Sequence, residues 1–374
     1  MIRRNGDAGP AGRSWSLEAG AEPGRLWRPG ADGGLVEGAP WQPSRRPPGR
    51  DTARRRKVAR TRTGRRADPA YRTVWIAGAR RPERVPSAGG AVTLLCRVTI
   101  GDRLLVASAA GDGTVALADP ATGRARHTLR TEPGQVRALV PLSLPGASCL
   151  GIVTADGSLT AWAPEQGWGQ TFTVHGGRAT TATCAEAGML AVGGEDGTVE
   201  VRALGENRRR WTATAGGGPV AALCELPGLI AAAGADGHIR LRDTESGSLL
   251  RTLEPEHGPL HAICPVPVGD RTLLGSAGGD GLVLLWDPDT GERRLELAGH
   301  AGPVTAVCPV PGGDGRTAVL ASTGVDRTAR LWDPRTGECR MTVPLHHEAT
   351  ACVAAGDHLI VGLAAGTVAY GLDL

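Results

Sequence analysis

The sequence contains nearly the same thirteen residues twice, as "GDGLVLLWDPDTG" at 279–291 and as "VDRTARLWDPRTG" at 325–337. In each copy an aspartate-containing turn precedes a short apolar run, and a proline-containing turn follows it. Asp-Gly favours the two-residue turn of a β-hairpin, and Asp-Pro-x-Thr-Gly suits a type I turn that is followed by a left-handed glycine. The stretch therefore predicts a strand between two tight turns. Its repetition leads us to search for further copies.

Five more copies of this unit follow one another along the chain, at 111–123, 155–167, 195–207, 235–247 and, in a degenerate form, at the C-terminus. The aspartate of each turn marks the phase of the repeat, and successive markers lie about 42 residues apart. The markers are Asp112, Asp156, Asp196, Asp236, Asp280 and Asp326, with Ala365 in the last unit. An additional apolar strand such as "PVAALC" (219–224) precedes the units, which gives four strands per period. Four-stranded units repeated in this way predict an all-β fold, a seven-bladed β-propeller of antiparallel blades.

The repeats resemble the WD-repeat family over residues 71–374. The resemblance is carried by the pairs Trp286-Asp287 and Trp332-Asp333 and by Gly299-His300. It implies that the ring closes by pairing its first and last segments. We therefore expect "YRTVWIAG" (71–78) to form the outer strand of the last blade beside 367–374, the alternative being that 71–78 is an apolar linker.

The resemblance also implies a hydrogen-bonded tetrad within a blade, made of a His, a Ser or Thr, the turn Asp and the Trp. The sixth unit matches every position, with the residues His300, Ser322, Asp326 and Trp332. The fifth unit matches in part, with the residues Ser276, Asp280 and Trp286, whereas His257 is one place out of phase. Arg202, Arg242 and Ala118 stand at the Trp position elsewhere. We interpret these residues as structural rather than as a hydrolase triad, because no nucleophile elbow accompanies them.

The chain contains eight cysteines but no CxxC motif. Six of them occupy one equivalent position in the predicted innermost strands: Cys96, Cys184, Cys224, Cys264, Cys308 and Cys352. Val140 takes this position in the second unit, which indicates a small buried hydrophobic site rather than a metal ligand. No phosphate-binding loop occurs and Lys57 is the single lysine, so we expect no metal and no cofactor.

Residues 1–70 differ in composition from the repeats. They carry 16 Arg and Lys against 7 Asp and Glu, and nine of the basic residues lie in 49–66. Because the segment is rich in Arg, Gly and Pro and lacks a sustained apolar period, we expect it to be a disordered arm. Three interpretations stay open: the arm binds nucleic acid or another anionic surface, it is a solvated linker, or it is translated sequence upstream of the true start.

We expect the protein to be a non-catalytic scaffold or sensor module that docks partner proteins or peptides on the propeller faces. The residues beside the turn aspartates are mostly small and neutral, which argues against a strongly charged peptide on that rim. The partner-facing candidates are Glu195, Arg137 and His261. The first alternative is association with nucleic acid or an anionic surface through 49–66, and the second is an enzyme that uses the central channel. No membrane span or secretory signal is evident in the sequence, so we expect a cytoplasmic protein. The sequence leaves the oligomeric state open.

Overall fold

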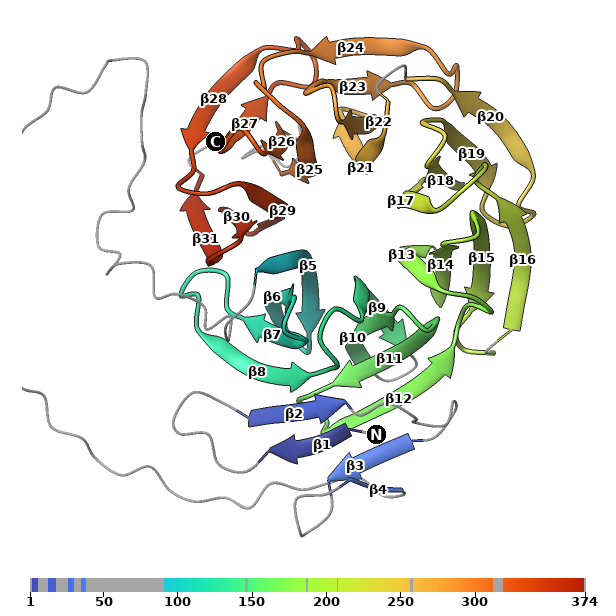
Figure 1. Ribbon diagram of the computed structural model, residues 1–374, viewed down its shortest axis with the longest axis vertical. Helices are drawn as coiled ribbons and strands as arrows, with labels where there is room; N and C mark the ends of the chain where they lie inside the picture. The colour runs from blue at the N-terminus through green and yellow to red at the C-terminus, as the bar shows by residue number, and fades with distance from the viewer. Residues whose placement is uncertain are drawn as a thin grey trace, which may run out of the picture.

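The protein is a seven-bladed β-propeller, in which seven antiparallel sheets stand around a central axis (Figure 1). The computed structural model describes the backbone of residues 2–5, 13–17, 26–29 and 35–37, and it describes residues 91–372 apart from 145–146, 186–187, 207, 256–257 and 312–318. Six blades contain the four-stranded meander that the repeats predict. The described part of the seventh blade contains three strands. The predicted fold class is thus confirmed.

The blades follow one another in chain order, and within each blade the strands run from the axis outward. Blade 1 consists of β5 (Val92–Ile100), β6 (Arg103–Ala110), β7 (Thr114–Ala118) and β8 (Ala125–Arg130), and blade 2 of β9 (Val136–Leu144), β10 (Ala147–Thr154), β11 (Ser158–Ala163) and β12 (Trp168–Thr173). Blade 3 consists of β13 (Ala179–Ala185), β14 (Met189–Gly194), β15 (Thr198–Ala203) and β16 (Arg208–Thr214), and blade 4 of β17 (Val220–Leu226), β18 (Leu229–Gly234), β19 (Ile239–Asp243) and β20 (Leu249–Leu253). Blade 5 consists of β21 (Leu260–Val268), β22 (Arg271–Gly278), β23 (Val283–Trp286) and β24 (Arg293–Leu297), and blade 6 of β25 (Val304–Val310), β26 (Val319–Gly324), β27 (Thr328–Trp332) and β28 (Cys339–Pro344). Blade 7 consists of β29 (Ala349–Ala355), β30 (His358–Leu363) and β31 (Gly366–Gly371).

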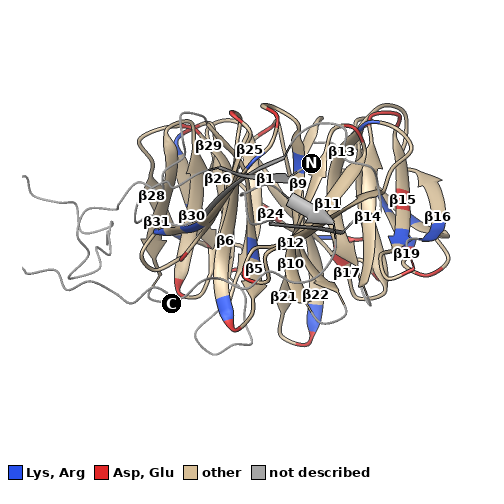
Figure 2. Cartoon of the chain, turned by 90° about the horizontal axis from the view of Figure 1, so that it is seen from below, with Lys and Arg blue, Asp and Glu red and all other residues tan. Residues whose placement is uncertain are grey.

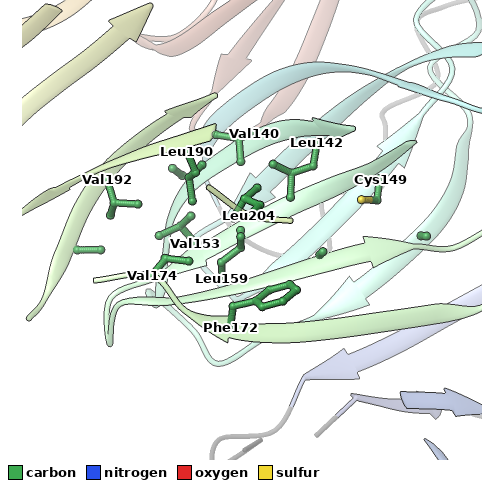
Figure 3. Packing of buried hydrophobic residues seen from close by; sticks show 14 residues of the cluster. Val140, Leu142, Cys149, Val153, Leu159, Phe172, Val174, Leu190, Val192 and Leu204 are labelled. Carbon is green, nitrogen blue, oxygen red and sulfur yellow. The ribbon is translucent and has the colours of Figure 1, made fainter. Parts of the chain in front are cut away.

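The core lies between the blades, where the faces of neighbouring sheets pack on one another. Figure 3 shows the cluster between blades 2 and 3, in which Val140, Leu159 and Leu190 point toward one another from different strands. The second strand of each blade is rich in small residues because the neighbouring sheet lies close to it: a Cβ at Gly193 would lie 2.6 Å from Cβ of Val220. Alanine, valine and leucine therefore fill most of the core, in agreement with the low aromatic content of 3%.

Blade 7 packs against blade 1 and so closes the ring. Ala355 and Ile360 of blade 7 form one buried cluster with Val106 of blade 1, and the Thr350 hydroxyl donates a hydrogen bond to the carbonyl of Val92. The predicted strand 71–78, and hence its pairing with the last blade, lies outside the described residues. The seam between β29 and β5 is thus formed by packing and by a side-chain hydrogen bond.

Four short strands are described within residues 1–70, where the sequence analysis assigned none. These strands are β1 (Ile2–Asn5), β2 (Arg13–Leu17), β3 (Leu26–Pro29) and β4 (Leu35–Glu37). They lie outside blades 1 and 2, where β2 pairs with β8 in parallel and β3 pairs with β12 in antiparallel orientation (Figure 1). An outer blade strand has one unpaired edge, and pairing there uses main-chain groups of any sequence. This explains why apolar periodicity could not predict these strands. The described residues contain no helix long and apolar enough to cross a membrane.

Candidate functional site

One face of the ring carries two kinds of connection: the turn between the second and third strands of each blade, and the loop that leads from each outer strand to the next inner strand. We call it the turn face. Each blade is an antiparallel meander, so both kinds of connection lie on the same side of the ring. In Figure 2 this face points upward, opposite the β5–β6 and β21–β22 turns.

The six predicted turn aspartates all lie on the turn face, and each accepts a hydrogen bond from the backbone N–H two residues later. The N···O distances lie between 2.9 Å at Asp112 and 3.2 Å at Asp236. The other four are Asp156, Asp196, Asp280 and Asp326. The following residue adopts a left-handed backbone, as at Gly113 with φ 84°, where a Cβ would lie 2.3 Å from the carbonyl oxygen of Thr131. Blade 6 has Arg327 at this position, with φ 60°.

A second repeated hydrogen bond fixes the position of each turn. The residue before the aspartate donates its backbone N–H to the carbonyl that directly precedes the inner strand of the same blade. The six bonds run from Gly111, Ala155, Glu195, Ala235, Gly279 and Val325 to Ala91, Gln135, Arg178, Pro219, Pro259 and Pro303, over 2.8–3.1 Å. The turn face is therefore a set of short connections attached to the sheet ends by the main chain.

In blade 6, His300, Ser322, Asp326 and Trp332 form one chain of hydrogen bonds. The indole N–H of Trp332 donates to Oγ of Ser322 over 2.8 Å, and this oxygen lies 2.7 Å from Nε2 of His300. Nδ1 of His300 lies 2.9 Å from Oδ2 of Asp326. The chain is consistent if Ser322 donates to Nε2 and the imidazole donates from Nδ1 to the carboxylate.

The surroundings of these hydrogen-bonded residues favour a neutral imidazole on His300 beside an ionised carboxylate on Asp326. Burial is the main cause that lowers the pKa of His300, and the hydrogen bond to Asp326 opposes it. Burial would raise the pKa of Asp326, but hydrogen bonds from the Ala301 N–H, His300 and Thr328 together lower it. Each of the four side chains has a hydrogen-bond partner within the set, and Trp332 and Ser322 are almost fully buried. The arrangement holds the blade together and offers no exposed nucleophile.

The fifth blade has the partial version that the sequence predicts. The indole N–H of Trp286 donates to Oγ of Ser276 over 3.0 Å, and Asp280 caps its turn. His257 lies outside the described residues.

Two further residues at tetrad positions are absent from the sequence prediction. Trp162 pairs with Leu150 as Trp332 pairs with Leu320, and His127 of blade 1 lies edge-on to it. His175 lies four residues before the inner strand β13, as His300 lies four before β25, and its Nε2 is 2.9 Å from Oγ1 of Thr198. This spacing is the signal that could have identified His175.

Arginines take over tetrad positions in blades 3 and 4. Arg202, in the Trp position of blade 3, forms an ion pair with Glu200 over 2.5 Å. In blade 4, Arg242 donates to the carbonyls of Gly247 and Thr214 over 2.9 and 2.8 Å. The Arg240 guanidinium donates hydrogen bonds to the Asp236 carboxylate over 2.7 Å and to the carbonyl of Ala215. Arg240 thus links the turn to the preceding loop, as His300 does in blade 6. The network is thus replaced in these blades by other polar contacts.

The three predicted partner-facing residues lie in different environments. Glu195 is exposed on the turn face and forms an ion pair with Arg178 over 3.0 Å. Arg137 lies half-buried on the inner strand β9. His261 is exposed on the inner strand β21, but its Nδ1 lies 3.0 Å from the carbonyl oxygen of Val304 in the next blade.

His261 belongs to a set of hydrogen bonds that link neighbouring inner strands. The second residue of an inner strand bonds the carbonyl of the first residue of the next inner strand. The other members are Thr180 to Val220 and Thr305 to Ala349, both over 2.7 Å, and Thr350 to Val92. These bonds assign His261 a structural contact between blades 5 and 6.

The turn face is strongly acidic when its loops are counted together with its turns. Its described residues carry ten carboxylates and two guanidinium groups. The carboxylates are those of Asp112, Glu132, Asp156, Glu195, Asp196, Asp236, Glu254, Asp280, Asp326 and Glu348, and the guanidinium groups are those of Arg178 and Arg327. The residues directly before the turn aspartates, which suggested a neutral rim, are mostly uncharged, so the acidic character comes from the aspartates and the loops. The loop glutamates Glu132, Glu254 and Glu348 are exposed, and they lie outside the aspartate turns.

The cysteines are all free thiols. The six at the repeated position lie on the inner strands, five of them buried and Cys184 partly buried. Burial raises the pKa of Cys96, Cys149 and Cys184 to about 12, so these thiols stay protonated near neutral pH. Across the described part of the chain, no three His, Cys, Asp or Glu side chains are grouped so that they could hold a metal ion.

Comparison with known proteins agrees with this geometry. Residues 291–333, which run from the last turn of blade 5 to Asp333 directly after β27, match the family described as WD domain, G-beta repeat. The matched segment includes His300, Ser322, Asp326 and Trp332. A search of curated proteins finds no match for the chain. The match over this one repeat and the seven propeller blades together support the resemblance to the WD-repeat β-propeller family.

Proposed function

We propose that the chain is a non-catalytic scaffold that docks a basic segment of a partner protein on the turn face. WD-repeat propellers generally mediate protein interactions. The observation that carries the proposal is the excess of carboxylates on a face whose turns are attached to the sheet ends by the main chain. A fixed surface of one charge attracts an oppositely charged partner and limits the entropy lost on binding.

Catalysis in the central channel is the alternative from another class. The inner strands and the loop before β29 contribute three candidates, Arg137, His261 and Glu348. His261 is engaged with the Val304 carbonyl, and Glu348 is exposed in its loop. The three candidates are thus scattered over different blades, and one of them is engaged in a contact between blades, which favours the scaffold over the enzyme.

Charge reversal tests the docking face. Glu132→Lys and Glu348→Lys change exposed loop carboxylates of blades 1 and 7 that make no turn contacts. Glu338→Lys serves as the matched control, because Glu338 is exposed in the turn between β27 and β28 on the opposite face and forms no ion pair within the described residues. A partner captured from native lysate by the full-length chain should bind the two turn-face variants more weakly, and its binding to wild type should weaken with salt. Equal binding by all variants would exclude this face.

Nucleic-acid association through 49–66 stays a prediction, because this segment lies outside the described residues. A mobility shift with random DNA, compared between the full chain and the 71–374 fragment, tests it. A salt-dependent shift that requires residues 1–70 would support the arm as a second binding region. A partner protein that binds only the full chain would likewise move the docking site from the ring to the arm.

A further inference from the structure

The outer strand of blade 4 exposes two adjacent leucines. Leu249 and Leu250 on β20 are 50% and 55% exposed, and they are the large hydrophobic residues exposed in the described part of the chain. The strand reads "LLRTL", and only Leu253 at its end is buried. Exposed neighbouring leucines on one strand require an explanation, because the other blades keep such side chains in the core.

The repeat itself shows that leucine is a departure at this position. In the outer strands of blades 1, 5 and 6, the residue at the same β-bulge is an arginine that forms an ion pair with the aspartate directly after the third strand. The pairs are Arg126–Asp119 over 3.3 Å, Arg294–Asp287 over 2.8 Å and Arg340–Asp333. Blade 4 has the bulge and the aspartate, Asp243, but Leu250 replaces the arginine. Asp243 is satisfied instead by the hydroxyl and backbone N–H of Ser246, over 2.6 and 2.7 Å.

The strand also has an available hydrogen-bonding edge. β20 is the last strand of its sheet, so one side of its backbone is unpaired within the described residues. The same chain shows that such edges accept an added strand, because β2 pairs with β8 and β3 pairs with β12. An extended segment beside β20 would therefore gain main-chain hydrogen bonds and would lie next to both leucines.

The charges around the leucines define the kind of segment that fits. Arg251 follows them on β20, and Arg208, Arg209 and Arg210 are exposed on β16, the outer strand of the neighbouring blade. Neither strand contains a carboxylate. The connections at the ends of these strands supply three carboxylates: Glu206, which forms an ion pair with Arg210 over 3.7 Å, and Glu245 and Glu254, which are exposed. The edge is thus apolar at its centre and basic along its flank.

We infer that the outer edge of blade 4 is a second docking surface, which takes an extended strand of a partner protein that carries apolar side chains and flanking carboxylates. The partner strand adds to the free edge of β20, covers Leu249 and Leu250, and places its carboxylates near Arg251 and the arginines of β16. This surface lies on the outer wall of the ring, away from the turn face.

A displayed library of random ten-residue peptides tests the inference. It is selected on the full chain and counter-selected on Leu250→Arg, a variant that restores the residue of blades 1, 5 and 6 and can pair with Asp243. We expect the enriched peptides to alternate apolar with acidic residues, and Leu250→Arg to weaken their binding at least about tenfold. Arg293→Ala, at the position of blade 5 that corresponds to Leu249, should bind them as wild type does. Amide hydrogen exchange should show new protection at 249–253 when the peptide is bound.

Three results would overturn the inference: selection enriches no peptide that distinguishes the two chains, the peptides are not acidic, or the protection appears elsewhere than β20. A membrane surface would give a different pattern, in which vesicles containing phosphatidylserine bind wild type but not Leu250→Arg while no peptide is enriched. Because the Glu132→Lys and Glu348→Lys variants leave β20 intact, they should keep peptide binding. Failure of one docking surface is therefore distinguishable from failure of the other.

Discussion

Removing the hydroxyl of Ser322 should destabilise the protein more than removing that of Ser276. In blade 6 the Ser322 hydroxyl serves two buried groups, the Trp332 indole at 2.8 Å and the His300 imidazole at 2.7 Å. In blade 5 the Ser276 hydroxyl serves the Trp286 indole alone, at 3.0 Å. Both serines are fully buried and occupy the same position in their blades. Ser322→Ala therefore leaves two buried groups without a hydrogen-bond partner, whereas Ser276→Ala leaves one.

Leaving a buried polar group without its partner costs about 1–3 kcal/mol. Ser276→Ala, which orphans one group, should thus lower the free energy of unfolding by about 1–3 kcal/mol, and Ser322→Ala, which orphans two, by about 2–6 kcal/mol. Urea unfolding, followed by circular dichroism and by tryptophan fluorescence, measures both losses. A Trp332→Phe background should reduce the cost of Ser322→Ala, because the indole donor is then gone.

The reasoning would be refuted if both serines cost the same, or if Trp332→Phe left the cost of Ser322→Ala unchanged. Either result would mean that the network in blade 6 contributes no more than a single hydrogen bond.

Four further perturbations follow from the structure. Arg327→Gly should stabilise the chain by about 0.5–1 kcal/mol, since Arg327 has φ 60° where the other blades have glycine, whereas Gly281→Ala at φ 83° should destabilise it in the same thermal melt. Thr350→Val removes the hydrogen bond to Val92 and should speed amide hydrogen exchange in β29 and β5. Thr305→Val, the control, removes the bond to Ala349 and should speed exchange in β25 and β29 but not in β5. Unchanged exchange in both variants would show that these bonds do not hold neighbouring blades together. Burial lowers the pKa of His300 below 6.5, so at acidic pH the unfolded chain binds a proton that the folded chain does not, and stability falls as the pH drops below about 6.5. In His300→Gln, the urea midpoint should depend less on pH between about pH 7 and 5. A pH dependence equal to that of wild type would contradict this. Deleting 1–80 should lower thermal stability clearly more than deleting 1–69, which removes only the strands added to the outer edges of blades 1 and 2, and coincident melting curves of the two truncations would refute closure by 71–78.

Much of the fold could be predicted from the sequence because its information is local and repeated. The turn aspartates and the inner-strand cysteines fixed the phase of the blades, and each turn aspartate lies in the predicted turn. The strands β1 to β4 could not be predicted in this way, because they add to sheet edges through the main chain and need no apolar period.

The site was harder to predict because its members are recognised one blade at a time. His175 was missed because its blade has Arg202 in place of Trp, and Trp162 because Ala163 follows it where an aspartate was expected. His261 looked like a channel residue, yet the geometry of neighbouring strands brings it to the Val304 carbonyl. The charge of the turn face depends in part on loop residues such as Glu132, Glu254 and Glu348, which lie outside the repeated hairpin pattern.

The distribution of the thiols has a practical consequence. Cys339 on β28 is the exposed one among eight, while the others are buried or partly buried. A maleimide dye should therefore attach to blade 6 alone in the unaltered protein. Such a label would report on movements of the outer wall by fluorescence without any engineered attachment point.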